Sequence, residues 1–280
     1  MCGIVGYVGT PGQSKPALGV VIDALRRMEY RGYDSAGIAL LDGSGGMAVE
    51  KKAGKLDNLV ATVESAGLEN YPATTGIGHT RWATHGRPTD INAHPHVDQL
   101  GKIAVVHNGI IENFAPLHAE LEAQGVEFTS ETDTETVTHL LHAEYYGEGP
   151  NAGNFTASVM AVINRLEGAF TLVIAHADHP DMLMACRRST PLVIGVGEHQ
   201  MFLGSDVAAF IEHTREAVEL GQDNVVTITA DGYTITDFEG NPVEGRPFTI
   251  DWDLEAAEKC GYDYFMLKEI AEQPQALADT

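Results

Sequence analysis

Apolar residues recur along the chain in two patterns that predict its secondary structure. Short apolar runs bounded by glycine or polar residues predict strands in the first half, at residues 3–9, 38–41, 48–51, 75–79 and 103–107. Apolar residues at helical spacing, such as Leu18, Val21, Ile22 and Leu25, predict amphipathic helices. These helices are expected at residues 14–27, 56–63, 113–123, 132–145 and 155–166. After residue 168 the pattern predicts strands at 170–175, 182–186, 192–196, 201–203, 225–229 and 233–236.

The order of these elements indicates the fold class. Strands come in runs with helices between the groups, which is typical of an α+β protein. We therefore expect two mainly antiparallel sheets with flanking helices in one domain, residues 1–248. The composition shifts near Pro247, and residues 249–280 are predicted to form a separate helical segment. We interpret that segment as an interdomain linker of a longer polypeptide.

Composition narrows the choice of partners and compartment. The 280 residues include 40 acidic and 17 basic side chains, a formal net charge of −23. Such a surface repels nucleic acid and anionic membranes, so neither is an expected partner. Cys2, Cys186 and Cys260 are scattered and predict no disulfide framework. With neither a recognisable export signal nor an apolar run near 18 residues, we expect a cytoplasmic protein.

The first three residues, Met1, Cys2 and Gly3, carry the most suggestive chemistry. If Met1 is removed, Cys2 presents a thiol and a free α-amine in one residue. Their reference pKa values are about 8.5 and about 7.7–8.0, so near neutral pH the amine can accept the thiol proton. An N-terminal amine that activates its own side chain is a known kind of nucleophile. The alternative is that Cys2 is a small apolar residue entering a strand.

Three further clusters each allow a functional and a structural interpretation. Arg81, with Trp82, Thr84 and His85, combines a fork suited to a carboxylate with an aromatic lid and polar groups. The same residues also fit a solvated arginine beside a core tryptophan.

Asn108 and Gly109 follow the strand predicted to end at His107, and their amide and backbone N–H could form an oxyanion hole. They also fit an ordinary Asn-Gly turn. Asp133 opens a predicted helix, where it could hold a ligand ammonium or act as a first-turn carboxylate. His94 and His96 match no strong zinc spacing, so we expect no metal site and no cofactor.

Six stretches in order closely resemble the glutaminase domain of the glutamine–fructose-6-phosphate aminotransferase (isomerizing) family, also called glucosamine-6-phosphate synthase. They are MCGIVG at 1–6, EYRGYDSAG at 29–37, GHTRWATHG at 78–86, NAHPH at 92–96, HNGIIEN at 107–113 and SETDTE at 130–135. The stretch MLKEIAEQP at 266–274 resembles that family's interdomain linker. Other class-II amidotransferases share the N-terminal cysteine and differ in the second and third stretches.

The resemblance implies an N-terminal-nucleophile hydrolase fold, a four-layer αββα sandwich, with glutamine as ammonia donor. It implies that Cys2 is the nucleophile and that Asn108 and Gly109 stabilise the oxyanion. It further implies binding and supporting residues whose roles follow the family's motifs. Arg81, Thr84 and His85 would hold the glutamine α-carboxylate, Asp133 its α-ammonium, and Trp82 would belong to a closing loop, with Arg31 and His94 in supporting motifs.

The family's sugar-isomerase half, which takes fructose 6-phosphate, lies outside this sequence, and the full-length family enzyme is expected to be a homodimer. The expected reaction here is hydrolysis of L-glutamine through a γ-glutamyl thioester. The alternatives are the glutaminase of another class-II amidotransferase, a different N-terminal-cysteine amidohydrolase, a non-catalytic domain that retains the fold, or a metal-binding module.

Overall fold

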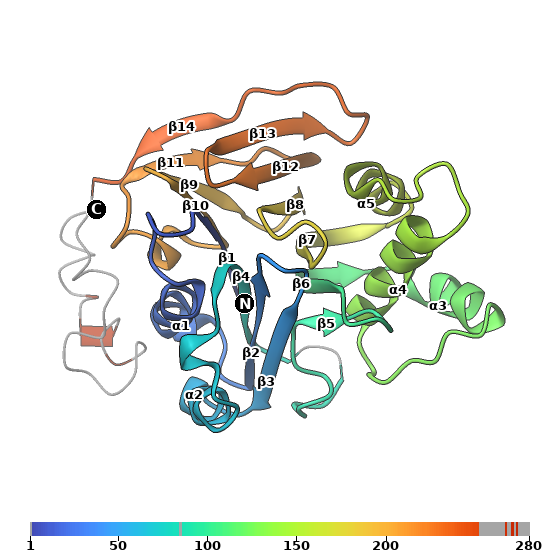
Figure 1. The fold of residues 1–280 in the computed structure, drawn as a ribbon, viewed down its shortest axis with the longest axis horizontal. Helices are drawn as coiled ribbons and strands as arrows, with labels where there is room; N and C mark the ends of the chain where they lie inside the picture. Colours follow the sequence, from blue (N-terminus) through green and yellow to red (C-terminus); the bar gives the residue numbers. More distant parts are fainter. Residues whose placement is uncertain (1, 84–85, 252–266, 268–269, 272, 274–280) are drawn as a thin grey trace.

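The computed structural model describes residues 2–83, 86–251, 267, 270–271 and 273, and these residues form two antiparallel sheets with helices on their outer faces (Figure 1). The eight-stranded sheet has the order β14 (Arg246–Thr249), β11 (Glu216–Glu219), β9 (Val193–Gly197), β10 (Gln200–Gly204), β1 (Gly3–Gly9), β4 (Ala73–Arg81), β2 (Ser35–Asp42) and β3 (Met47–Ala53). The six-stranded sheet has the order β13 (Gly232–Asp237), β12 (Asn224–Thr229), β8 (Met182–Arg188), β7 (Gly168–His176), β6 (Ile103–Ile111) and β5 (His96–Val97).

Five α-helices flank these sheets among the described residues. They are α1 (Ala17–Met28), α2 (Leu56–Ser65), α3 (Phe114–Ala123), α4 (Asp133–Tyr146) and α5 (Phe155–Ile163). Three short 3-10 helices complete the described regular structure, η1 (Glu29–Arg31), η2 (Leu68–Asn70) and η3 (Val207–Ala209). Figure 1 shows α1 and α2 together beside the eight-stranded sheet and α3, α4 and α5 together beside the six-stranded sheet.

Alternation along the strands divides the core into three layers of apolar side chains. In β1, Val5 and Tyr7 pack with α1 and α2, whereas Ile4 and Val8 face the second sheet. In β6 the side chain of Val105 packs toward α3, α4 and α5, in a third cluster. Three apolar interfaces define four layers, helix–sheet–sheet–helix, and confirm both the α+β prediction and the αββα sandwich that the resemblance implied.

The predicted end of one strand at residue 107 is wrong. β6 continues to Ile111, and within it Asn108 pairs with Thr171 and Gly109 with Phe170 of β7. Asn and Gly have low strand propensity, but pairing with a buried neighbour outweighs that preference. An Asn-Gly turn is therefore excluded, and both residues sit on a paired strand.

Other differences concern short or polar elements. The strands β5, β11 and β14 are absent from the predicted set, because each has at most four residues and little apolar character. Asn113 precedes α3 as expected but makes no cap bond, since its side chain binds the backbone of Arg165 and Glu167 instead. Most of the predicted linker, 249–280, lies outside the described residues, so the domain boundary stays a prediction. No helix in the described part is long and apolar enough to span a membrane.

Candidate active site

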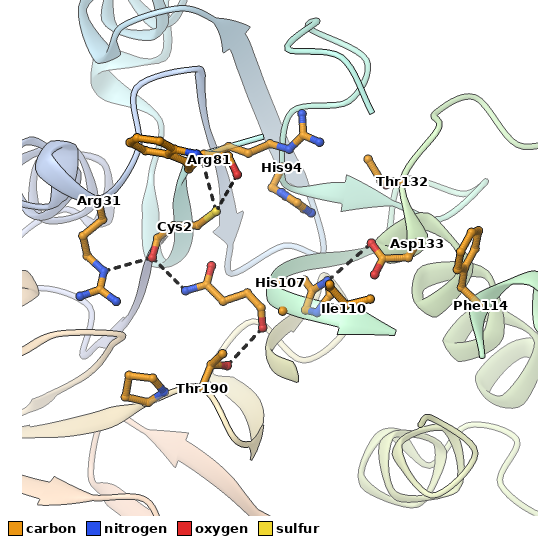
Figure 2. A pocket seen from close by; sticks show the side chains of 14 residues that line it. Cys2, Arg31, Arg81, His94, His107, Ile110, Phe114, Thr132, Asp133 and Thr190 are labelled. Atoms are coloured by element: carbon orange, nitrogen blue, oxygen red, sulfur yellow. Dashed lines mark hydrogen bonds and ion pairs between the residues drawn. The ribbon is translucent and has the colours of Figure 1, made fainter. Parts of the chain in front are cut away.

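Cys2 lies immediately before β1 and lines a cavity of about 330 Å³ (Figure 2). The strand fixes its position, because Gly3 pairs with Thr80 and Ile4 with His79 of β4. Fourteen residues line the cavity: Cys2, Arg31, Arg81, Trp82, His94, His107, Asn108, Gly109, Ile110, Phe114, Thr132, Asp133, Thr190 and Pro191. The structure thus brings together every described residue that the sequence assigned to a site, while Thr84 and His85 lie outside the described residues.

The thiol of Cys2 is held by the backbone of Trp82. The Trp82 N–H donates to Sγ at 3.2 Å, and Sγ lies 3.5 Å from the Trp82 carbonyl. Burial raises the pKa of the Cys2 thiol, opposed by the Trp82 N–H and by the charges of Arg81 and Arg31. A thiol with a raised pKa needs a base to become a nucleophile near neutral pH.

The carbonyl of Cys2 is fixed by two side chains. Arg31 Nε donates to it at 3.1 Å, and Asn108 Nδ2 donates at 3.0 Å. Arg31 is itself held by Asp206, which lies 3.4 Å from its guanidinium and also accepts from Tyr30. Arg31 therefore supports the position of the nucleophile and touches the cavity wall at the same time.

Gly109 shows why this strand position requires glycine. Its φ is +129°, a region that L residues rarely adopt, and a Cβ there would lie 2.0 Å from the carbonyl oxygen of Ala169. Asn108, 7% exposed, and Gly109 both line the cavity beside Cys2. Asn108 and Gly109 carry an amide N–H and a backbone N–H, the donor types that an oxyanion hole uses, and both residues line the same cavity as the thiol.

Arg81 ends β4, and its side chain is 4% exposed. Its guanidinium donates to the carbonyls of Arg87 at 3.3 Å and Gly86 at 3.5 Å, so the arginine organises the loop that follows it. Trp82, by contrast, is 45% exposed and meets Tyr33 edge to face at 5.5 Å between ring centroids. The alternative of a core tryptophan beside a solvated arginine is therefore wrong for both residues.

Asp133 is the first residue of α4 and faces the cavity wall. Its Oδ2 accepts from the N–H of Ile111 at 2.8 Å, while Oδ1 lies 3.8 Å from His107 Nδ1 (Figure 2). The carboxylate is thus oriented by a strand backbone, and it also accepts from the Thr134 hydroxyl of its own helix at 3.4 Å. Asp133 therefore occupies the first turn of α4, and its side chain also has a partner outside that helix, the N–H of Ile111.

Three buried, neutral histidines, His94, His96 and His107, lie in or beside the wall of the cavity. His94 donates or accepts at 2.9 Å with Thr134, and His107 does the same with the same hydroxyl. His96 pairs with Thr132 at 2.9 Å. Burial lowers the pKa of all three imidazoles, and for His107 this acts against the attraction of Asp133. Within the described ranges no group of three or more His, Cys, Asp or Glu could hold a metal ion.

Three residues that support the site lie outside the stretches of sequence that predicted it. Ser205, just after β10, accepts from the N–H of Ile4 at 2.9 Å and so holds the nucleophile's strand. Its neighbour Asp206 holds Arg31. Thr190 also lines the cavity, and its hydroxyl donates to the carbonyl of Asn108 at 3.2 Å. Polar residues directly after a buried strand were the available clue for the first two.

Comparison with known proteins shows what this chain is similar to. Residues 79–212 match the family described as "Glutamine amidotransferase domain". A solved glutamine phosphoribosylpyrophosphate amidotransferase from B. subtilis superposes with a TM-score of 0.69 at 23% identity, over 86% of this chain and 50% of that chain. A glutamine aminotransferase class-II domain protein from Silicibacter pomeroyi gives a TM-score of 0.54 at 17% identity, over 85% of this chain and 99% of that one. Residues 79–212 are thus similar to glutamine amidotransferase domains, and the solved structures show that this chain has the N-terminal-nucleophile fold.

Two sequence relatives carry the same name. The glutamine–fructose-6-phosphate aminotransferase [isomerizing] of Mycolicibacterium smegmatis is 67% identical, over all of this chain and 45% of that protein. The enzyme of the same name from Streptomyces coelicolor is 60% identical, over all of this chain and 44% of that protein. This chain is similar over its whole length to these relatives and spans less than half of theirs.

Proposed function

We propose that this site hydrolyses the side-chain amide of L-glutamine to glutamate and ammonia through a thioester on Cys2. The observation that supports it best is the placement of Cys2, Asn108, Gly109, Arg81 and Asp133 around one cavity. These residues supply a nucleophile, oxyanion donors and one group for each end of an amino-acid zwitterion.

The nucleophile is the thiol of Cys2 after removal of Met1. Its raised pKa means that little thiolate forms unaided, and the new α-amine, directly or through a water, takes the proton. Sulfur then attacks the amide carbon, and the oxyanion accepts hydrogen bonds from the Asn108 amide and the Gly109 N–H. The amine returns the proton to the leaving nitrogen, ammonia departs, and water hydrolyses the γ-glutamyl thioester to release glutamate.

Recognition of the substrate uses opposite charges at its two ends. Arg81 offers a planar fork to the α-carboxylate, with Thr84 and His85 as the proposed additional contacts. Asp133, already oriented by the Ile111 N–H, offers a carboxylate to the α-ammonium. Trp82, exposed at the mouth of the cavity, is proposed to close over bound substrate. Arg31 and His94 support these groups through the Cys2 carbonyl and through Thr134.

The decisive experiment uses protein whose intact mass shows that Met1 is absent. Glutamate release from L-glutamine is expected for this material and not for protein that retains Met1, whose peptide bond would remove the base. An electrophilic glutamine analogue should modify Cys2 alone, as located by peptide mass spectrometry. Modification of Cys186 instead, or no glutamate from correctly processed protein, would refute the proposal.

We propose that this chain is part of a longer polypeptide, in which the ammonia passes to a sugar-isomerase half that binds fructose 6-phosphate. The names of the relatives and the share of their length outside this chain support this. The present chain alone should then release ammonia to solvent and make no glucosamine 6-phosphate. Joining the missing half should restore sugar amination, and the joined protein is expected to be a homodimer in the cytoplasm.

A further inference from the structure

His79 lies near the end of β4, two residues before Arg81, is fully buried, and points between the two sheets toward the cavity residues. Its Nε2 is 3.1 Å from the carbonyl of His107 and 3.1 Å from Oδ1 of Asn108. It does not line the cavity itself. Its contact with Asn108 is nevertheless the link between the eight-stranded sheet and the proposed oxyanion donor.

The orientation of the Asn108 amide follows from its other partner. The Cys2 carbonyl can only accept, so the atom 3.0 Å from it must be the amide nitrogen. The amide oxygen therefore faces His79. Rotating the amide by 180° would place oxygen against the Cys2 carbonyl and nitrogen against His79.

The proton on His79 is fixed by the same reasoning. Both neighbours of Nε2, the His107 carbonyl and Asn108 Oδ1, are acceptors, so Nε2 must carry the hydrogen. Burial lowers the pKa of His79 to about 3, reinforced by the charge of Arg81 and opposed by the hydrogen bonds to Asn108 and to the His107 carbonyl. The ring is therefore neutral near pH 7, and Nδ1 is a bare nitrogen without a hydrogen-bond partner in the described part of the chain.

We propose that His79 is a positioning residue that, as the Nε2–H tautomer, holds the Asn108 amide with its N–H groups directed to the Cys2 side. This rests on the proposed function, because the amide matters only if an oxyanion forms. One Asn108 N–H serves the Cys2 carbonyl and the other remains for the oxyanion. Without the His79 donor, Oδ1 is left buried and unpaired, and an amide rotated to satisfy it would present oxygen to the developing negative charge.

Kinetics of His79→Phe, which removes the donor, test this proposal on Met1-free protein. Loss of one oxyanion donor costs about 10²–10³ in kcat, so we expect a fall of at least about 30-fold in kcat with KM changed less than about threefold. His79→Gln retains an N–H donor and should recover activity to within about tenfold of the parent, since a neutral amide can replace the imidazole hydrogen bond. In the Asn108→Ala background, His79→Phe should change kcat by less than about threefold, because the residue acts through Asn108.

His176→Phe is the matched control for disturbing a buried histidine. His176 is fully buried in β7 at the end that pairs with Ile103, whereas Asn108 pairs with Thr171. The control should keep kcat, and the melting temperature of each variant reports folding separately. A parent-like kcat for folded His79→Phe, or an equal loss in the Asn108→Ala background, would overturn the proposal.

A measurement independent of activity uses ¹⁵N NMR of the His79 ring. Long-range proton–nitrogen correlations should show a neutral ring protonated on Nε2 from pH 5 to pH 8. A proton on Nδ1, or titration within this range, would overturn the proposal even in an active enzyme. If the parent released no glutamate, the proposed function would fail while the tautomer assignment would still be tested.

Discussion

Replacing Gly109 with alanine should both destabilise the fold and impair glutamine hydrolysis. The new Cβ would lie 2.0 Å from the Ala169 carbonyl oxygen and 2.8 Å from Cα of Phe170. Both atoms belong to the backbone of β7, so no side-chain rotation can relieve the contact. The strand pair β6–β7 must separate locally or Gly109 must leave its present conformation.

The magnitude can be estimated from two contributions. A non-glycine residue at φ +129° costs about 1–3 kcal/mol, and loosening the β6–β7 ladder sacrifices one or two hydrogen bonds at about 1 kcal/mol each. We expect the free energy of unfolding to fall by about 2–5 kcal/mol. A displacement near 1 Å of the Gly109 N–H can cost about 10²-fold in rate, so kcat should fall by about that factor.

Gly232→Ala supplies the matched control. Gly232 has φ +157° at the start of β13, but a Cβ there would meet nothing within 4 Å. It should therefore show only the conformational cost and leave kcat unchanged. Urea unfolding followed by circular dichroism gives the free energies, and a coupled glutamate assay gives kcat. If Gly109→Ala were no less stable than Gly232→Ala and equally active, the close approach of β6 and β7 would be wrong.

Three further predictions address nucleophile, substrate and pH. Cys2→Ala should abolish glutamate release and change the urea unfolding free energy by less than about 1 kcal/mol; residual turnover would exclude Cys2 as nucleophile. Asp133→Asn should raise KM about tenfold or more, equivalent to about 1.4 kcal/mol, because the ammonium loses its counter-charge, and an unchanged KM would favour a structural first-turn role. Burial depresses the folded-state pKa to about 3 for His79 and about 4 for His176, so the unfolded chain binds more protons below pH 6.5. Unfolding free energy should therefore fall as pH drops from 6.5 toward 4, less steeply in His176→Asn, and a flat profile in urea titrations would contradict this.

Sequence periodicity predicted most of the long elements because they are decided by local patterns. The strand at residues 3–9 was placed to the residue, and α1 and α4 differ from their predicted ranges mainly at the ends. β6 was cut short because Asn108 and Gly109 read locally as a turn, and only pairing with β7 reveals the strand. Short β11 and β14 are held by neighbours distant in sequence, which no local pattern records.

The sequence predicted candidate site residues that stand in stretches resembling a known family. It did not predict the residues that hold those side chains in position. Cys2, Asn108 and Asp133 stand in recognisable stretches, and all three reach one cavity. Ser205 and Asp206 lie more than 200 residues after Cys2, and their contacts arise because β10 pairs with β1. Such support depends on sheet order, and the sequence does not encode it in any motif.

Arg81 and Asp133 are the two charged groups proposed to bind glutamine. A series of hydrogen bonds connects Arg81 with the segment that precedes Asp133. Arg81 donates to the Arg87 carbonyl, and Asn92 Nδ2 donates to the same oxygen at 3.1 Å. Asn92 also exchanges bonds of 2.9 Å with Glu131, through the Glu131 N–H and carboxylate. Glu131 lies two residues before Asp133.

This series of hydrogen bonds has a physical consequence for the proposed recognition of glutamine. Lys51 holds the segment around Asn92 by donating to the carbonyls of Ile91, Ala93 and Pro95 at 3.0, 2.9 and 3.2 Å. Burial lowers the pKa of Lys51 to about 8, so the ammonium still predominates at neutral pH. A network anchored on β3 therefore links Arg81 to Glu131, two residues before Asp133, and restrains the distance between the two charged groups. A pre-set distance lowers the entropy cost of binding a zwitterion, and it disfavours ligands whose charges are spaced differently.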